Sequence, residues 1–124
     1  MTIATHGKQI IISRARNGIA MSQVSTNSSW QPMIHRSASR ELSHAPTEVQ
    51  HGIREVAVEA AQLQKPSSHP DIKLMRGCNM MRIRVGQHRA LCDRYPPQFR
   101  ILLVDRRDAV YRRTEEAKTR ANSE

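Results

Sequence analysis

The number and positions of the arginines are the clearest indication of function in this sequence. The net charge is +9, and sixteen of the twenty basic residues are arginines. Ten arginines and three aspartates, but no lysine, lie between residues 76 and 113, which gives this segment a net charge of +7. One guanidinium can bind two phosphate oxygens at once. The segment therefore predicts binding to a nucleic-acid backbone or to an acidic protein, with a solvated basic face as the alternative.

Cysteine and histidine show no spacing typical of a metal site. The two cysteines, Cys78 and Cys92, are too few for a disulfide framework and lack the closely spaced pairs of zinc ligands. We expect free thiols, buried or half-buried, and neither a metal nor a cofactor. Apart from the one histidine of the basic segment, the histidines are expected at the surface or as helix caps: His6, His35, His44, His51 and His69.

The length of the chain, 124 residues, suits one small domain. Aromatic residues make up only 3% of it, so the core must consist of aliphatic side chains and methionine. No apolar run approaches the roughly 18 residues that span a membrane, and no apolar segment near residue 1 resembles a secretory signal. The sequence therefore predicts a soluble, cytoplasmic protein that makes no membrane contact.

The first 28 residues are expected to form a disordered extension. Residues 22–29 read SQVSTNSS, which is typical of a polar linker, and no acidic residue precedes Glu41. Two other interpretations stay open. An organelle transit peptide is also poor in acidic residues and contains arginine and serine. Alternatively, translation begins at Met21, directly before the linker.

Two helices are predicted before the basic segment. The first spans residues 37–43, with Ser37 suited to the N-cap position. The second spans residues 46–64, with Pro46 in its first turn and Pro66 after its end. The short connection between the helices indicates an αα-hairpin. One face of the second helix carries an apolar stripe at helical spacing: Val49, Ile53, Val56, Ala57, Ala60 and Leu63.

Strand-like alternation replaces the helical spacing after residue 80. In the run MMRIRVG, Arg82 and Arg84 alternate with apolar residues, which places both arginines on one face of a strand. Two further strands are predicted at residues 88–93 and 99–104. The short turns between the three strands require antiparallel pairing.

The remaining segments complete a small fold. A strand is predicted at residues 30–34, where Pro32 restricts it to an edge of the sheet. Residues 114–124 are polar and are expected to form a tail or a short helix. Together the elements predict an α+β fold in which an N-terminal helical hairpin packs on a small antiparallel sheet.

The order of these motifs resembles that of the RelE/ParE superfamily, the toxins of type II toxin–antitoxin modules. The runs LMRGCNMMRIRVGQHRALCD and ILLVDRRDAVYRR carry the resemblance. The family has a Leu-x-Gly after its helices, and Leu74 with Gly77 is similar to it. Next come a basic strand with Arg-Val-Gly, an arginine on the following strand and an Arg-rich turn with Val-Tyr. This sequence has these motifs in the same order. The resemblance covers residues 29–113 and implies a RelE-like toxin domain there.

The resemblance implies two possible targets. RelE-like members are ribosome-dependent endoribonucleases that cleave messenger RNA in the ribosomal A site and so inhibit translation. ParE-like members share the fold but inhibit DNA gyrase. Either kind is held inactive by a cognate acidic antitoxin in a hetero-oligomer. The leading hypothesis is a RelE-like messenger-RNA endoribonuclease, and the alternatives are a ParE-like gyrase inhibitor or a non-catalytic relative that binds RNA or protein.

The RelE-like hypothesis implies a reaction in which the RNA 2′-hydroxyl attacks its own phosphate. This chemistry needs no metal: cations stabilise the charge on phosphorus oxygens, and one group removes the 2′ proton. Arg89 and Arg107 match the family's arginines for charge stabilisation, with Arg106 as the alternative to Arg107 in register. Tyr111 matches the tyrosine that stacks on a base or contacts the 2′-hydroxyl.

The resemblance leaves the general base unassigned. Arg82 and Arg84 stand where RelE itself has lysines, and arginine is a poor proton acceptor. We therefore expect these two residues, together with Arg76 and Arg106, to bind the RNA backbone.

Two residues remain as candidate bases. His88 has a side chain that exchanges protons near neutral pH, but adjacent strand residues face opposite ways, so we expect it to point away from Arg89. Asp108 lies close to Tyr111 in sequence, and its alternative role is an ion pair with a neighbouring arginine.

Overall fold

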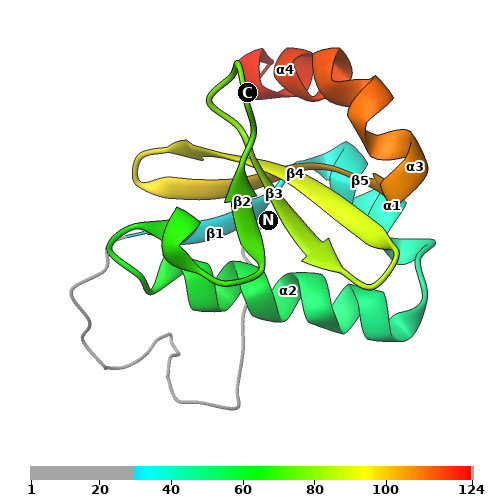
Figure 1. Cartoon of the computed structure of the whole chain (residues 1–124), viewed down its shortest axis with the longest axis horizontal. Helices are drawn as coiled ribbons and strands as arrows, with labels where there is room; N and C mark the ends of the chain where they lie inside the picture. Colours follow the sequence, from blue (N-terminus) through cyan, green and yellow to red (C-terminus); the bar gives the residue numbers. More distant parts are fainter. Residues whose placement is uncertain (1–29, 124) are drawn as a thin grey trace.

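The computed structural model describes residues 30–123, which form a five-stranded sheet with helices on both faces (Figure 1). The expected N-terminal extension and the choice between Met1 and Met21 lie outside these residues. No helix among the described residues is long and apolar enough to span a membrane. In chain order the elements are β1 (Gln31–Ile34), α1 (Arg36–Ser43), α2 (Thr47–Ala61), η2 (Pro66–Ser68), β2 (Ile72–Leu74), β3 (Met81–Val85), β4 (His88–Tyr95), β5 (Gln98–Arg106), α3 (Arg107–Val110), η3 (Tyr111–Arg113) and α4 (Thr114–Asn122).

Both predicted helices are present and form the predicted hairpin. The prediction of Ser37 as the N-cap is wrong, because His35 occupies that position. The His35 Nδ1 accepts a hydrogen bond from the Ser37 backbone N–H at 3.1 Å, so an imidazole nitrogen satisfies the free helix donor in place of a hydroxyl. α2 ends at Ala61, so Leu63 of the predicted stripe lies beyond the helix, while the other stripe residues are buried.

The three strands predicted in the basic segment are present as β3, β4 and β5. They pair antiparallel in that order, as expected from their short turns. A register shift between Leu91 and Cys92 interrupts the pairing of β4 with β5. Because of this bulge, the neighbours Leu102 and Leu103 pack in the same core cluster.

Two edge strands complete the sheet, in the order β1-β5-β4-β3-β2, and both depart from the sequence pattern. β1 lies at an edge, as Pro32 requires, but it pairs with β5 in parallel, with Ile34 opposite Ile101. Parallel pairing needs a long connection, and the chain passes through two α-helices, one short 3₁₀ helix and three strands between β1 and β5. β2 forms the other edge and is only three residues long, too short to show alternation in the sequence.

The sheet separates two apolar layers. The hairpin covers one face, where Ile53 and Ala57 of α2 belong to the same core cluster as Ile83 and Phe99 of the strands. The C-terminal segment covers part of the opposite face. There the α4 residue Ala117 is fully buried in a second cluster, which consists of Met80, Leu91, Leu102, Leu103, Val110 and Ala117. The polar segment 114–122 is therefore a packed helix, one of its two expected forms.

The two cysteines differ in how deeply they are buried. Cys78 is half-buried and Cys92 is fully buried, and both are free thiols, as expected. Burial raises the pKa of the Cys92 thiol well above its ordinary value, and the neighbouring Asp93 carboxylate adds to this effect. Cys92 is therefore an unreactive core side chain rather than a nucleophile.

Candidate functional site

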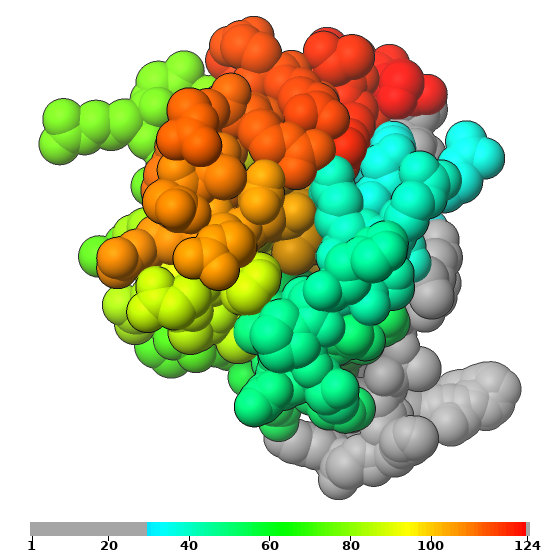
Figure 2. Space-filling view, turned by 90° about the vertical axis from the view of Figure 1, so that its right-hand side faces the viewer, coloured from blue at the N-terminus to red at the C-terminus, as the bar shows by residue number. Residues whose placement is uncertain are grey.

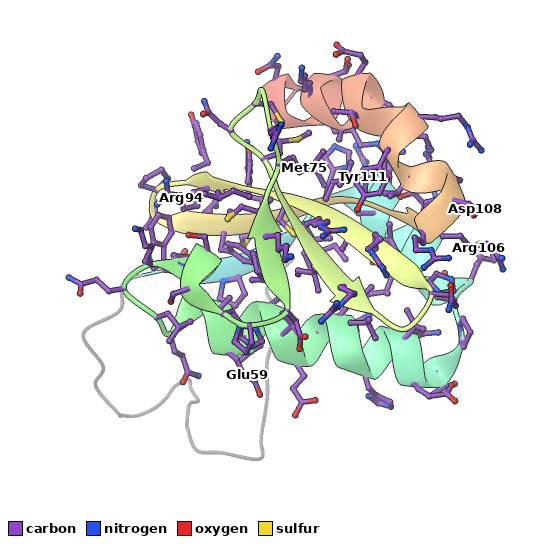
Figure 3. All side chains as sticks on the ribbon, viewed as in Figure 1. Glu59, Met75, Arg94, Arg106, Asp108 and Tyr111 are labelled. Carbon is purple, nitrogen blue, oxygen red and sulfur yellow. The ribbon has the colours of Figure 1, made fainter. Side chains whose placement is uncertain are left out.

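Two of the candidate residues are in direct contact on the face of the sheet that α3 and α4 partly cover. The Arg82 Nη1 donates a hydrogen bond to the Tyr111 hydroxyl oxygen at 2.6 Å, and the guanidinium carbon lies 6.0 Å from the ring centroid. Arg82 comes from β3, and Tyr111 is the first residue of η3. Tyr111 is 42% exposed and lies above the sheet (Figure 3), so a ligand can reach this pair.

Arg84 and Arg89 share the face of Arg82. Arg84 lies directly opposite Arg89 in the pairing of β3 with β4, and Arg82 lies opposite Leu91, which belongs to the core cluster under α4. The Arg84 side chain is 57% exposed, and its Nη2 lies 3.7 Å from an Asp71 oxygen. The alternation of the sequence therefore predicted correctly that Arg82 and Arg84 share a face; of the two, Arg82 contacts Tyr111.

Arg89 is bound to the backbone rather than open to a ligand. The residue is only 6% exposed, and its Nη1 donates hydrogen bonds of 2.9 Å to the carbonyl oxygens of Gly86 and His88. Its Nε is buried and has no hydrogen-bond partner within residues 30–123. Its predicted contact with a phosphate would require the guanidinium to leave the carbonyls of the β3–β4 turn.

Arg106, Arg107 and Asp108 lie where β5 passes into α3. Asp108 and Arg106 project from the edge of the molecule, as Figure 3 shows. The Asp108 side chain is 75% exposed, and its Oδ1 lies 3.6 Å from the Arg106 Nε. Arg107 is exposed, and its backbone N–H donates to the Gln87 carbonyl oxygen. The structure thus places Asp108 next to an arginine, the alternative considered for it.

His88 and Arg76 lie apart from the Arg82–Tyr111 pair. His88 is opposite Val85 on β3, which packs against the hairpin side of the core. It therefore faces away from Arg89, as strand alternation predicts. Arg76 is exposed in the connection between β2 and β3.

The general base stays unassigned. Within residues 30–123, neither Arg82 nor Tyr111 forms a hydrogen bond with a histidine or a carboxylate. In this part of the chain there is also no cluster of three or more histidine, cysteine or acidic side chains that could hold a metal ion. The polar group in contact with the Tyr111 hydroxyl is the Arg82 guanidinium.

An ion-pair network fixes the segment that carries Tyr111, and the sequence pattern does not reveal it. Glu41 of α1 accepts hydrogen bonds from Arg113 at 2.7 Å and from Arg120 at 2.9 and 3.0 Å. Arg113 also bonds to Asp105 and Glu116. Spacings of three and four residues could suggest the contacts of Glu116 with the two arginines, but Glu41 is 72 and 79 residues from them.

The same network forms hydrogen bonds with the backbone of β5 in the part of the strand that does not pair with β1. The Val104 N–H donates to a Glu41 oxygen at 3.0 Å, and Arg120 donates to the Leu102 carbonyl at 2.9 Å. Burial raises the pKa of the Glu41 carboxyl, but hydrogen bonds from Arg120, the Val104 N–H and Arg113 together hold it below its ordinary value. Glu41 is thus an ionised anchor that joins α1, β5 and α4.

No protein-family model and no curated protein sequence matches the chain. Among solved structures it is similar to the RelB–RelE antitoxin–toxin complex from Methanococcus jannaschii, with 22% identity over 66% of this chain and 98% of that chain and a TM-score of 0.56. The chain has the RelE-like fold.

Two further solved structures are similar to this chain and share the RelE-like fold. One is the toxin–antitoxin complex RelBE2 from Mycobacterium tuberculosis, with 22% identity, 61% of this chain and 88% of that chain covered, and a TM-score of 0.50. The other is the archaeal RelE–RelB complex from Pyrococcus horikoshii, with 18% identity, 64% and 96% covered, and a TM-score of 0.52. The α+β fold with a helical hairpin on the sheet is therefore confirmed.

Proposed function

We propose that this chain is the toxin of a toxin–antitoxin pair and that it cleaves messenger RNA on the ribosome. The observation that carries the proposal is the accessible Arg82–Tyr111 pair on the basic face of a RelE-like sheet. An aromatic ring beside guanidinium groups can stack on an unpaired base while the cations bind the adjacent phosphates. The three similar structures described above are toxin–antitoxin complexes, which supports the same class.

In the proposed reaction the 2′-oxygen of the RNA attacks the adjacent phosphorus. The bond from phosphorus to the 5′-oxygen breaks, which leaves a 2′,3′-cyclic phosphate and a free 5′-hydroxyl. Arg82 and Arg84 bind the phosphate and stabilise its extra negative charge. The Tyr111 hydroxyl, held by Arg82 at 2.6 Å, contacts the 2′-hydroxyl, and the ring packs against the adjacent base.

The proposed partners follow from charge. Residues 76–113 have a net charge of +7, and their accessible arginines suit both RNA and an acidic antitoxin segment that covers the same face. We expect the toxin and antitoxin to form a hetero-oligomer in the cytoplasm.

One observation favours a second candidate function, a relative that binds RNA or protein without cleavage. Arg89, expected to stabilise the transition state, is buried and bonded to two backbone carbonyls. No side-chain hydrogen bond or ion pair joins His88 or Asp108 to Arg82 or Tyr111. A chain of this kind would bind RNA with steep salt dependence and leave it intact.

The deciding experiment is primer-extension mapping of a defined messenger RNA incubated with the purified protein, with and without programmed ribosomes. The proposal predicts cuts only when ribosomes are present. Cuts in naked RNA would retain the nuclease but remove the ribosome as partner. Intact RNA in both reactions, from folded protein, would leave the binding relative, or a gyrase inhibitor if supercoiling by gyrase is lost in a parallel assay.

A further inference from the structure

Lys73 lies on β2 directly beside Arg82, on the face of the sheet that carries Tyr111. The lysine and the arginine are opposite each other in the antiparallel pairing of β2 with β3, so their side chains point to the same face with Cβ atoms about 5 Å apart. Within residues 30–123, Lys73 is the one lysine in a strand, and β2 is too short for the sequence pattern to indicate it. Its ammonium group is therefore within reach of a phosphate that Arg82 binds.

The Lys73 ammonium is open to a ligand. The residue is exposed, and β2 is an edge strand, so no further strand of the described sheet lies beyond it. Within residues 30–123, the Lys73 side chain forms no hydrogen bond or ion pair, and Asp71, two residues earlier, lies instead 3.7 Å from the Arg84 Nη2. Lys73 differs in this respect from Arg89, whose guanidinium is bonded to the β3–β4 turn.

Arg82 lies between Tyr111 and Lys73. In the order of the sheet, β3 has β4 on one side and β2 on the other. The helix α3, which leads into η3, packs on β4 and β5, and Figure 2 shows α3 and η3, in orange, beside the yellow-green start of β4. Tyr111 therefore reaches Arg82 from the β4 side, whereas Lys73 reaches it from the β2 side. A phosphate bound by Arg82 has the tyrosine hydroxyl on one side and the ammonium group on the other.

We infer that Lys73 is the general acid of the cleavage reaction, the group that gives a proton to the leaving 5′-oxygen. The inference rests on the proposed function. In a displacement at phosphorus, the attacking and leaving oxygens lie in line on opposite sides of the phosphorus atom. With the 2′-oxygen beside Tyr111, the 5′-oxygen is on the side of Lys73. A lysine ammonium carries a proton at neutral pH and can donate it, whereas an arginine guanidinium holds its protons too firmly.

Proton transfer from Lys73 completes the exchange of bonds at phosphorus. The 2′-oxygen forms its bond to phosphorus as the bond from phosphorus to the 5′-oxygen breaks. The electron pair of the broken bond stays on the 5′-oxygen, which takes a proton from the Lys73 ammonium. The 2′ proton passes to solvent water, from which the Lys73 amine regains a proton after the product leaves. Lys73 thus assists the leaving group and is not the acceptor of the 2′ proton.

The test compares two messenger RNAs on programmed ribosomes, one with the normal linkage at the mapped cleavage site and one with sulfur in place of that 5′-oxygen. The sulfur leaves as a thiolate and needs no proton, because thiols are far more acidic than alcohols. We expect K73Q to cleave the normal linkage about a hundredfold more slowly than the wild type and the sulfur linkage at the wild-type rate. K73R should also be slow on the normal linkage, since arginine keeps the charge but is a poor proton donor.

The control K65Q removes an exposed lysine that follows α2, the helix on the other face of the sheet, and should cleave both linkages at the wild-type rate. Thermal unfolding checks that each variant is folded. If K73Q is slow on both linkages, Lys73 is a phosphate contact and not the acid. If K73Q cleaves the normal linkage as fast as the wild type, Lys73 has no part in the reaction. Both results leave the proposed function standing. Intact RNA of both kinds after incubation with the folded wild type would instead contradict the proposed function, and the acid role with it.

Discussion

Arg82 and Arg89 lie on the same face of the sheet, but they are available to a ligand to different degrees. Arg82 is half-buried and contacts Tyr111, whereas Arg89 is 6% exposed and bonds to the turn between β3 and β4. A guanidinium that already satisfies two backbone carbonyls contributes to folding. We therefore propose that Arg82 contacts RNA and that Arg89 stabilises the β3–β4 turn.

The stability of an Arg89→Gln variant tests the second assignment. The substitution removes the donor that the Gly86 and His88 carbonyl oxygens share, and it leaves a partly filled space under the turn. We expect the free energy of unfolding to fall by about 2 kcal/mol, the cost typical of buried polar groups left without partners. Urea unfolding followed by circular dichroism measures the loss. An unchanged midpoint would mean that the guanidinium has no structural role.

The salt dependence of RNA binding tests the first assignment. Arg82→Gln removes one cation from the proposed RNA face, so the slope of log affinity against log salt should become shallower by about 0.7 for single-stranded RNA. Fluorescence anisotropy over a salt series gives this slope. Arg94→Gln serves as the matched control, because Arg94 stacks on Trp30 away from Tyr111. Equal slopes for both variants would remove Arg82 from the interface.

The sequence predicts which residue types form the site better than it predicts their contacts. Alternation along β3 and β4 places Arg82, Arg84 and Arg89 on one face, and the structure agrees. Burial is not visible in that pattern, because it depends on how the β3–β4 turn folds back over Arg89. The Arg82–Tyr111 contact joins residues 29 positions apart, and no local spacing indicates it.

At the level of elements, the C-terminal helix is held by charge as well as by apolar packing. Glu41 of α1 joins Arg113 and Arg120, which flank most of α4, and the same carboxylate caps the Val104 N–H of β5. The polar composition of residues 114–124 therefore does not mark a free tail. Its arginine and glutamate side chains add polar contacts to the apolar packing of Ala117 on the sheet.

The pH dependence of stability should report this attachment. The folded protein holds the pKa of Glu41 below its ordinary value, so the stabilisation is complete above about pH 4.3, the unfolded value. It is lost as the pH falls through the lower pKa of the folded state. We expect Glu41→Gln to lose about 2 kcal/mol at neutral pH and to show a weaker decline in acid. Urea unfolding from neutral pH to about pH 3 measures both effects. Parallel pH profiles for the two proteins would contradict this role.

Close packing of α2 on β3 depends on a glycine. A Cβ at Gly52 would lie 2.7 Å from a Val85 methyl carbon. Gly52→Ala should therefore lower the free energy of unfolding by about 1 kcal/mol or more, although alanine favours helices by a similar amount. The double variant Gly52→Ala with Val85→Ala should recover part of this loss. A stabilised single variant, measured by thermal unfolding, would show that the helix can move outward freely.

A helix or strand could be predicted where its own residues repeat at the spacing of that element. Period-two alternation predicted β3, and helical spacing predicted α2. The parallel pairing of β1 with β5 could not be predicted from the turns, because it joins residues 67 positions apart, such as Ile34 and Ile101. β2 is too short for a period, and its place is set by pairing with β3.

For the whole molecule, the two apolar layers leave most arginines of the basic segment at the surface, with Arg89 and Arg100 as buried exceptions. The hairpin buries one side of the sheet, and α3 and α4 cover only part of the other, so the basic segment is presented around Tyr111 and at the end of β5. The RelE-like fold thus offers a basic surface to the partners that we propose, RNA and an acidic antitoxin. The central claim is that the Arg82–Tyr111 pair acts on RNA there.

The most direct test of this claim is the single-turnover rate of messenger-RNA cleavage on programmed ribosomes by the wild-type chain, Tyr111→Phe and Tyr95→Phe. Tyr95 is a matched control, since it is 62% exposed and also lies beside an arginine, Arg100. We predict that Tyr111→Phe cleaves about a hundredfold more slowly than the wild type, while Tyr95→Phe cleaves at the wild-type rate. Equal rates for the three proteins, or no cleavage by the folded wild type, would contradict the account.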